Sequence, residues 1–161
     1  DDMLASKEIL KQIVNEFKKN KIDGLYGDLQ YVSNSNLGDI IRYWKSKPFN
    51  SKLLKKGWMP AHPTLFLKNS IYKRYGSFDV SYKISADYNF MLGILKNPDL
   101  KFEYIPKVVT KMRVGGASNR NLKNIIQKTK EDYRAIRNNE VGGFLTLILK
   151  NISKVKQFFV K

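Results

Sequence analysis

The chain has 161 residues, the length of one domain, and 42% of them are hydrophobic, which is enough for a core. It contains no cysteine, which excludes disulfides and thiolate metal sites and fits a reducing compartment. Thirty Lys and Arg against fourteen Asp and Glu give a net charge of +16, of which residues 101–161 carry +10, so we expect an anionic partner: nucleic acid, a phosphorylated substrate or an acidic membrane face.

Apolar periodicity predicts the elements of the first half of the chain. In chain order these are a helix over 6–20, a strand over 22–32, a turn at 33–36, a short helix over 39–44, a surface loop over 46–57 and a strand in the second half of 58–67. No apolar run is long enough to cross a bilayer.

The second half alternates helices and strands in the same way, so the fold class is α/β. Its expected elements are a helix from Asn69 to Tyr75 stopped by Gly76, a helix capped by Ser85, one or two strands over 101–114 interrupted at Pro106, a flexible loop over 115–119, a basic helix over 121–138 and an amphipathic C-terminal helix.

Asp87 falls in the first turn of the helix that Ser85 begins, on the same face as Met91. One interpretation is a carboxylate that interacts with the helix dipole and the free N–H groups. The other is a general base, partly desolvated by apolar neighbours at the rim of a cleft. The local residues leave both open.

Other candidates carry a similar pair of interpretations. His62, the only histidine, is either a hydrogen-bonding structural residue or a contact to substrate or metal. Asp1 and Asp2 are either N-terminal acids or ligands of a divalent cation. Gly115 and Gly116 form either a plain loop or a backbone cradle for an anion.

Aromatic residues can stack on sugar rings or bases, or can pack in the core. This applies to Tyr26, Trp44, Trp58 and Tyr88.

In the C-terminal segment 144–161, one stripe is apolar and lies opposite several lysines. The segment is therefore either an interfacial membrane helix or a helix packed on the domain. The stripe comprises Phe144, Ile148, Ile152, Val155 and Phe159, opposite Lys150, Lys154 and Lys156.

An ordered set of short motifs runs through residues 1 to about 133. The set is Asp1-Asp2-Met3-Leu4, Leu25-Tyr26-Gly27-Asp28, Met59-Pro60-Ala61-His62-Pro63-Thr64-Leu65-Phe66, Tyr75-Gly76-Ser77-Phe78-Asp79, Ser85-Ala86-Asp87-Tyr88, Tyr104-Ile105-Pro106 and Gly115-Gly116-Ala117-Ser118. In this order it resembles the second half of a bacterial family 2 glycosyltransferase of the polysaccharide and colanic-acid type.

The resemblance implies a mixed sheet of the GT-A fold over residues 1–138, followed by a basic amphipathic helix over 139–161. It implies an inverting transferase of cell-surface polysaccharide synthesis that uses a nucleotide-sugar donor, a glycan or lipid-linked acceptor and Mg or Mn. Asp87 then matches the catalytic base, and Asp1 and Asp2 match the end of the metal motif. The substrate-binding residues that it implies are His62, Asp28, Tyr88, Gly115, Gly116 and Ser118.

Three features depart from that family. Ala86 stands where many relatives have Glu, and Arg113 is not followed by the family's metal-binding His. The Gln-x-x-Arg-Trp signature of processive synthases is absent, which favours transfer of a single sugar. The family's nucleotide-binding half would precede Asp1, so we expect this chain to be a fragment that is inactive alone.

We expect the protein to be cytoplasmic and peripheral at the inner membrane face, where a lipid-linked acceptor would explain the basic C-terminal helices. Two alternatives stay open. A basic nucleic-acid-binding module would explain the charge but not the order of the motifs, so we expect no nucleic acid. A non-catalytic glycosyltransferase remnant would bind only acceptor or a partner.

Overall fold

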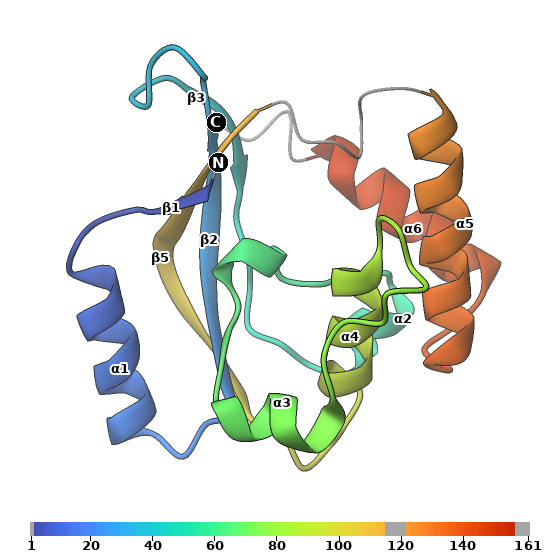
Figure 1. The fold of residues 1–161 in the computed structure, drawn as a ribbon, viewed down its shortest axis with the longest axis horizontal. Helices are drawn as coiled ribbons and strands as arrows, with labels where there is room; N and C mark the ends of the chain where they lie inside the picture. The colour runs from blue at the N-terminus through green and yellow to red at the C-terminus, as the bar shows by residue number, and fades with distance from the viewer. Residues whose placement is uncertain (1, 115–121, 157–161) are drawn as a thin grey trace.

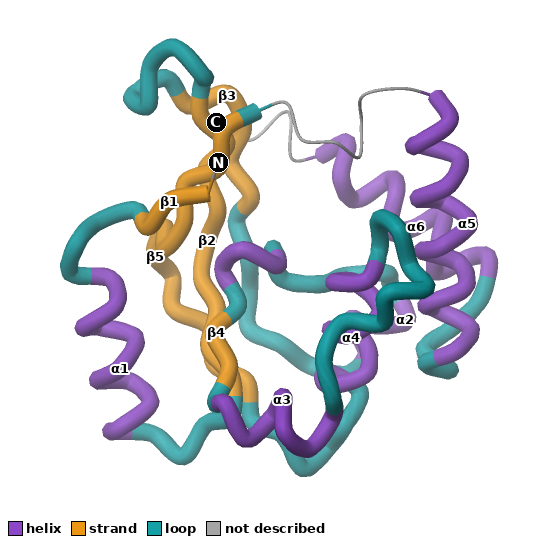
Figure 2. Tube along the Cα trace, in the orientation of Figure 1, coloured by secondary structure: helices purple, strands orange, loops and turns teal. Residues whose placement is uncertain are grey.

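The computed structural model describes residues 2–114 and 122–156, with side chains up to residue 153. Its centre is an open, mixed, five-stranded sheet (Figures 1 and 2). The strands are β1 (Asp2–Leu4), β2 (Gly24–Val32), β3 (Ile40–Trp44), β4 (Phe66–Leu67) and β5 (Phe102–Arg113). Their order is β1-β5-β2-β3. β4 pairs with the start of β2, on the edge of β2 that also pairs with β3. Only the β2–β5 pair is parallel.

Helices cover both faces of this sheet (Figure 1). They are α1 (Ile9–Lys19), α2 (Lys52–Lys55), the 3-10 helix η1 (His62–Thr64), α3 (Asn69–Tyr75), α4 (Ala86–Leu95), α5 (Leu122–Asn138) and α6 (Phe144–Lys156). On one face, α1 buries Ile9 and Ile13 against Leu25 and Val109 of the sheet. The other face carries the larger core, built around α4 and joined by α5 and α6. The α/β class with helices on a mixed sheet is thus confirmed.

Two predictions in the first half are wrong. Residues 39–44 contain the strand β3 rather than a helix, and Trp44 pairs with Leu29 of β2. The β-branched and aromatic residues of this segment favour a pleated, half-buried surface. The expected surface loop over 46–57 contains α2, because the adjacent Leu53 and Leu54 bury their side chains.

Pro106 does not interrupt the strand over 101–114, since β5 is continuous from Phe102 to Arg113. The register opposite β2 shifts there: Tyr26 pairs with Tyr104, and Asp28 pairs with Val108. A bulge of this kind accommodates a proline, which cannot donate to the ladder. The helix end at Gly76 is confirmed, with a φ of 82° that favours glycine.

The C-terminal helix α6 orients its predicted stripe away from the domain. Phe144 is 67% exposed and Ile152 is 51% exposed, whereas Lys150, expected on the polar side, is 3% exposed. The resemblance implied that the domain ends at residue 138 and that a separate helix begins at 139. Leu147 of α6 nevertheless belongs to the core around α4. The loop over 115–119, Phe159 and the side chain of Val155 lie outside the described residues. No helix in the described ranges is long and apolar enough to cross a membrane.

Candidate functional site

The structure pairs two residues that the sequence singled out separately. His62 Nδ1 lies 3.0 Å from Asp87 Oδ2, and both side chains are partly exposed. An ionised carboxylate only accepts hydrogen bonds, so Nδ1 carries the proton and donates to Asp87. The pair joins the 3-10 helix η1 to the first turn of α4.

The sheet positions His62 through η1. Thr64 Oγ1 donates to the Ala61 carbonyl at 2.7 Å, which closes the turn. Thr110 Oγ1 of β5 donates to the Pro63 carbonyl at 2.8 Å, which ties that turn to the sheet. The imidazole is therefore presented from a fixed backbone.

The start of α4 is positioned by Glu131, a buried residue of α5. Its carboxylate accepts the backbone N–H groups of Lys83, Ile84 and Ser85 at 2.8–2.9 Å. Ser85 precedes the helix as predicted, but its hydroxyl makes no capping bond and donates instead to Asp132 at 2.8 Å. A neighbouring helix thus supplies the acceptor that a capping serine normally provides.

The surroundings of Asp87 keep its carboxyl ionised. Burial by itself raises the pKa of this group. The hydrogen bond and electrostatic attraction from His62, the Tyr88 backbone N–H and the Lys150 ammonium together outweigh burial, so the pKa of Asp87 lies below its usual value. A carboxylate in this state is unprotonated at neutral pH, as a general base must be, but its lowered pKa also makes it a weaker base.

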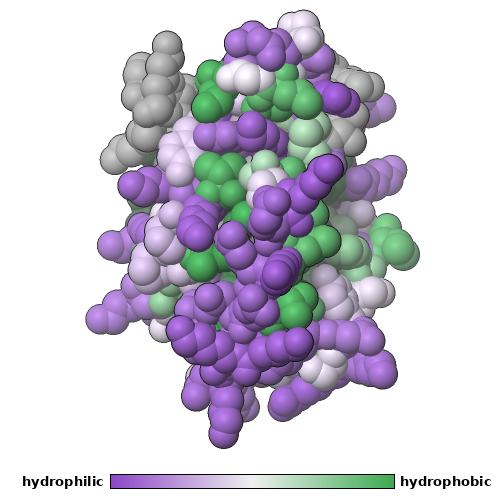
Figure 3. Space-filling view, turned by 90° about the vertical axis from the view of Figure 1, so that its left-hand side faces the viewer, coloured by the Kyte–Doolittle hydropathy of each residue, from purple (hydrophilic) through white to green (hydrophobic). Residues whose placement is uncertain are grey.

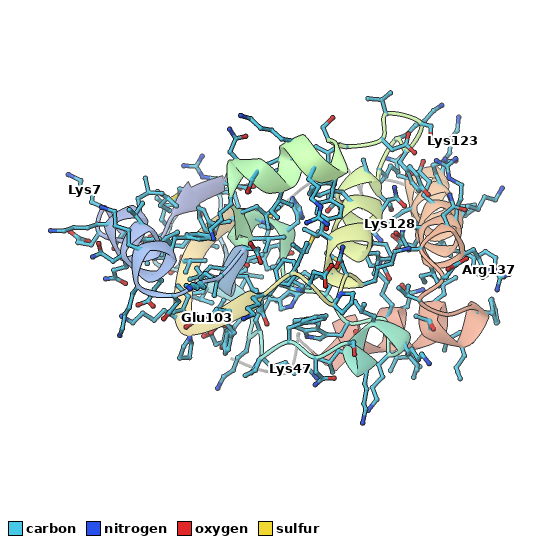
Figure 4. The ribbon with its side chains drawn as sticks, turned by 90° about the horizontal axis from the view of Figure 1, so that it is seen from below. Lys7, Lys47, Glu103, Lys123, Lys128 and Arg137 are labelled. Carbon is cyan, nitrogen blue, oxygen red and sulfur yellow. The ribbon has the colours of Figure 1, made fainter. Side chains whose placement is uncertain are left out.

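The His62–Asp87 pair lies on the wall of a cavity of about 180 Å³. Tyr31 and Met112, from the ends of β2 and β5, line one side of it. Lys128 of α5, Lys150 of α6 and the acid Asp132 line the same cavity. In Figure 4, Lys128 lies between α4 and α5.

Both lysines form ion pairs with Asp132, which is 1% exposed. The Lys150 ammonium also lies 3.6 Å from the centre of the Tyr88 ring. Tyr88 is 2% exposed and lines the cavity, and its hydroxyl has no hydrogen-bond partner in the part of the chain that is described. This network connects α6 to the residue next to Asp87.

Asp2 approaches the same end of the sheet. It pairs with Met112, a residue that lines the cavity. Burial raises the pKa of Tyr31, the charge of Arg42 lowers it, and the charge of Asp2 raises it further. Asp1, Gly115, Gly116 and Ser118 lie outside the described residues.

Among residues 2–114 and 122–156, no group of three or more His, Asp or Glu side chains is arranged to hold one metal ion. Asp2 contributes a single carboxylate there, so the Mg or Mn site stays a prediction.

Asp28 has a structural environment. It is 1% exposed, and its carboxylate accepts hydrogen bonds from the hydroxyls of Tyr43 and Tyr104 and from the backbone N–H of Ser46. These bonds join β2, β3 and β5. The structure does not bring Asp28 to the cavity that contains Asp87.

Sequence reasoning missed the lysines and acids that surround Asp87. Two signals pointed to them. Glu131 and Asp132 are adjacent acids in an otherwise basic helix, and Lys150 interrupts the apolar start of α6. Charges so placed often pair inside the protein rather than with solvent.

Fold and site together define an α/β protein with an open mixed sheet and an acid–histidine pair on the wall of a cavity lined by both acids and lysines. No protein-family model matches the chain, and no curated protein matches it.

Proposed function

We propose that this chain is the acceptor-side part of an inverting glycosyltransferase with a GT-A-like fold, acting in cell-surface polysaccharide synthesis. The observation that carries the proposal is the ionised Asp87, held by His62 on the wall of a cavity. The ordered motifs that resemble family 2 glycosyltransferases support the same reaction.

In the proposed reaction, an acceptor hydroxyl attacks the anomeric carbon of a nucleotide sugar. The new carbon–oxygen bond forms as the bond to the nucleoside diphosphate breaks, and the leaving group keeps the electron pair. Asp87 takes the hydroxyl proton, a contribution of about 10²–10⁴-fold for a positioned base. His62 orients the carboxylate.

The divalent metal implied by the family would offset charge on the departing diphosphate. Asp2 is the one residue of the implied metal motif that lies within the described residues. Lys128 and Lys150 line the cavity, where both form ion pairs with Asp132.

The function is tested by incubating the full native protein, of which this chain would form the acceptor-side part, with a panel of nucleotide sugars and a lipid-linked sugar acceptor. We expect mass spectrometry to show addition of one sugar, and NMR to show an inverted anomeric configuration. Retention of configuration, or release of nucleoside diphosphate without a glycosylated product, would contradict the proposal.

We also propose that the protein docks at the anionic inner face of the cell membrane. The outward side of α6 exposes Phe144 and Leu145, each 67% exposed, together with Ile148 and Ile152. The net charge of +10 over residues 101–161 complements an anionic surface.

Flotation with vesicles containing anionic phospholipid tests this docking. We expect binding at low salt that weakens at high salt and is lost in Phe144→Ser/Ile148→Ser. Leu10→Ser/Val14→Ser is the matched control, because it removes two exposed apolar residues from α1 on the opposite side of the sheet. That side is mainly hydrophilic (Figure 3). Equal binding by both variants would contradict the docking proposal.

A further inference from the structure

A small pocket of about 50 Å³ lies against the His62–Asp87 pair, on the side of β4, α3 and α4. Apart from the pair, its walls are aliphatic and aromatic. The residues concerned are Leu65, Leu67, Tyr72, Phe78, Phe90 and Met91. We call it the apolar pocket.

The apolar pocket adjoins the larger cavity, because His62 and Asp87 line both. The larger cavity also contains the ion-paired lysines, whereas no lysine from the described residues lines the apolar pocket. A molecule that brings a hydroxyl to Asp87 in the cavity can therefore place a neighbouring substituent in the pocket, and that substituent has to be apolar.

The aromatic wall of the pocket is built around Phe90 of α4, which is buried. The Tyr72 ring of α3 stacks on it, with centroids 5.4 Å apart and an angle of 6° between the planes. The Phe78 ring meets Phe90 edge-on at the same separation and 69°. Gly76, whose φ is 82°, ends α3 between these two rings and lets the chain turn. The pocket is thus held by ring contacts from two successive segments.

The size of the pocket limits what it holds. A cavity needs about 10–15 Å³ to contain one water molecule, so 50 Å³ is room for a methyl or acetyl group but not for a sugar ring. Water in such surroundings makes few hydrogen bonds, and an apolar group that displaces it gains affinity.

We propose that the apolar pocket binds a methyl group of the acceptor sugar, carried either by an acetamido group or by C6 of a 6-deoxy sugar. This assignment rests on the proposed glycosyl transfer. It makes the pocket a specificity site, which selects a sugar by the substituent close to the reacting hydroxyl.

Saturation-transfer NMR on the full native protein tests the assignment without any transfer reaction. The probes are N-acetylglucosamine, 6-deoxyglucose and glucose, so the first two distinguish the sources of the methyl group and the third lacks it. We expect one methyl-bearing sugar to bind about tenfold or more tightly than glucose, with the strongest saturation at its methyl protons. Equal affinity for all three sugars, or strongest saturation at the ring protons, would overturn the proposal.

A pair of tyrosine variants separates the pocket from the rest of the surface. Tyr72→Ser removes one ring of the wall and should reduce the affinity for the preferred sugar toward that for glucose. Tyr133→Ser is the matched control, because both tyrosines are 39% exposed and Tyr133 of α5 lines neither the pocket nor the larger cavity. Equal losses in the two variants would overturn the proposal.

A variant that fills the pocket gives an independent readout. Leu65→Phe adds the volume of a ring to the wall, so it should abolish the preference for the methyl-bearing sugar while glucose binds as before. A preference that persists in Leu65→Phe would contradict the assignment.

Binding and transfer are measured separately, so the two proposals can fail separately. Asp87→Asn should keep the preference for the methyl-bearing sugar while losing transfer. Such a preference without any transfer by the full native protein would contradict the glycosyltransferase proposal and uphold the pocket. Equal kcat/KM for acceptors that end in glucose and in the methyl-bearing sugars would overturn the specificity site alone.

Discussion

Asp87 stays ionised through its neighbours rather than through exposure. His62 contributes through a hydrogen bond, and Lys150 contributes through its charge. The sequence placed Asp87 in the first turn of its helix, because Ser85 and the apolar spacing were sufficient for that. It did not pair Asp87 with His62, since that contact depends on how η1 packs on the sheet.

Replacing His62 should raise the pKa of Asp87. In His62→Ala the effect of burial is no longer offset by the imidazole, so the pKa rises toward or above its usual value. His62→Asn is the matched control, because its amide N–H takes the place of Nδ1–H. NMR titration of the Asp87 carboxyl should show the rise in the Ala variant and a smaller one in the Asn variant. No difference between the variants and the wild type would contradict the role of His62.

Glu131 makes stability depend on pH in a range that can be measured. Burial raises the pKa of this carboxyl, but the Gln127 side chain and three backbone N–H groups lower it to about 2. The unfolded-state pKa of Glu is about 4.3. The stabilisation is therefore present above that value and is lost as the pH falls toward 2.

Glu131→Gln should lower the free energy of unfolding by about 2 kcal/mol at pH 7, since hydrogen bonds to a charged group weaken. The difference from wild type should shrink below pH 4 or so, as linkage requires. Urea denaturation at several pH values measures it, with the exposed Glu140→Gln as control. A pH-independent difference would show that the charge of Glu131 is not responsible.

At the scale of elements, the sequence located α1, α4 and α5, but only α1 buries one clear apolar face, with Ile9 and Ile13. α4 is buried on most sides, and the buried face of α5 includes Glu131 and Asp132. Periodicity also located α6, but it did not show which side of this helix packs on the domain, because tertiary contacts decide which residues are buried. Lys150 is buried because Asp132 and the Tyr88 ring receive its ammonium. Gly57 permits the approach: its φ is 69°, and a Cβ there would lie 2.6 Å from Lys150 Cβ.

Lys150→Met should loosen α6 from the domain. It removes one of the two ion pairs of the buried Asp132, and breaking a buried pair costs about 3 kcal/mol. Urea denaturation measures the loss, and the exposed Lys52→Met is the control. Adding Asp132→Asn should recover part of the loss, because it removes the buried charge. Additive losses would contradict the coupling between α5 and α6.

At the scale of the whole molecule, the alternation of helices and strands was enough to predict an α/β fold. Local patterns could not predict the pairing order of the strands. The apolar residues of β3 were also compatible with a helix, and it is the pairing with β2 that makes this segment a strand. The candidate site likewise draws on η1, α4, α5 and α6. Only the packed fold brings their cavity residues together.

The central claim is that Asp87 removes the proton of the acceptor hydroxyl during glycosyl transfer. The most direct test compares initial rates of transfer by the native protein and its Asp87→Asn variant, with the exposed Asp99→Asn as control. We predict a loss of about 10²–10⁴-fold for Asp87→Asn and none for Asp99→Asn. Transfer by Asp87→Asn at a rate near that of the wild type would contradict the claim.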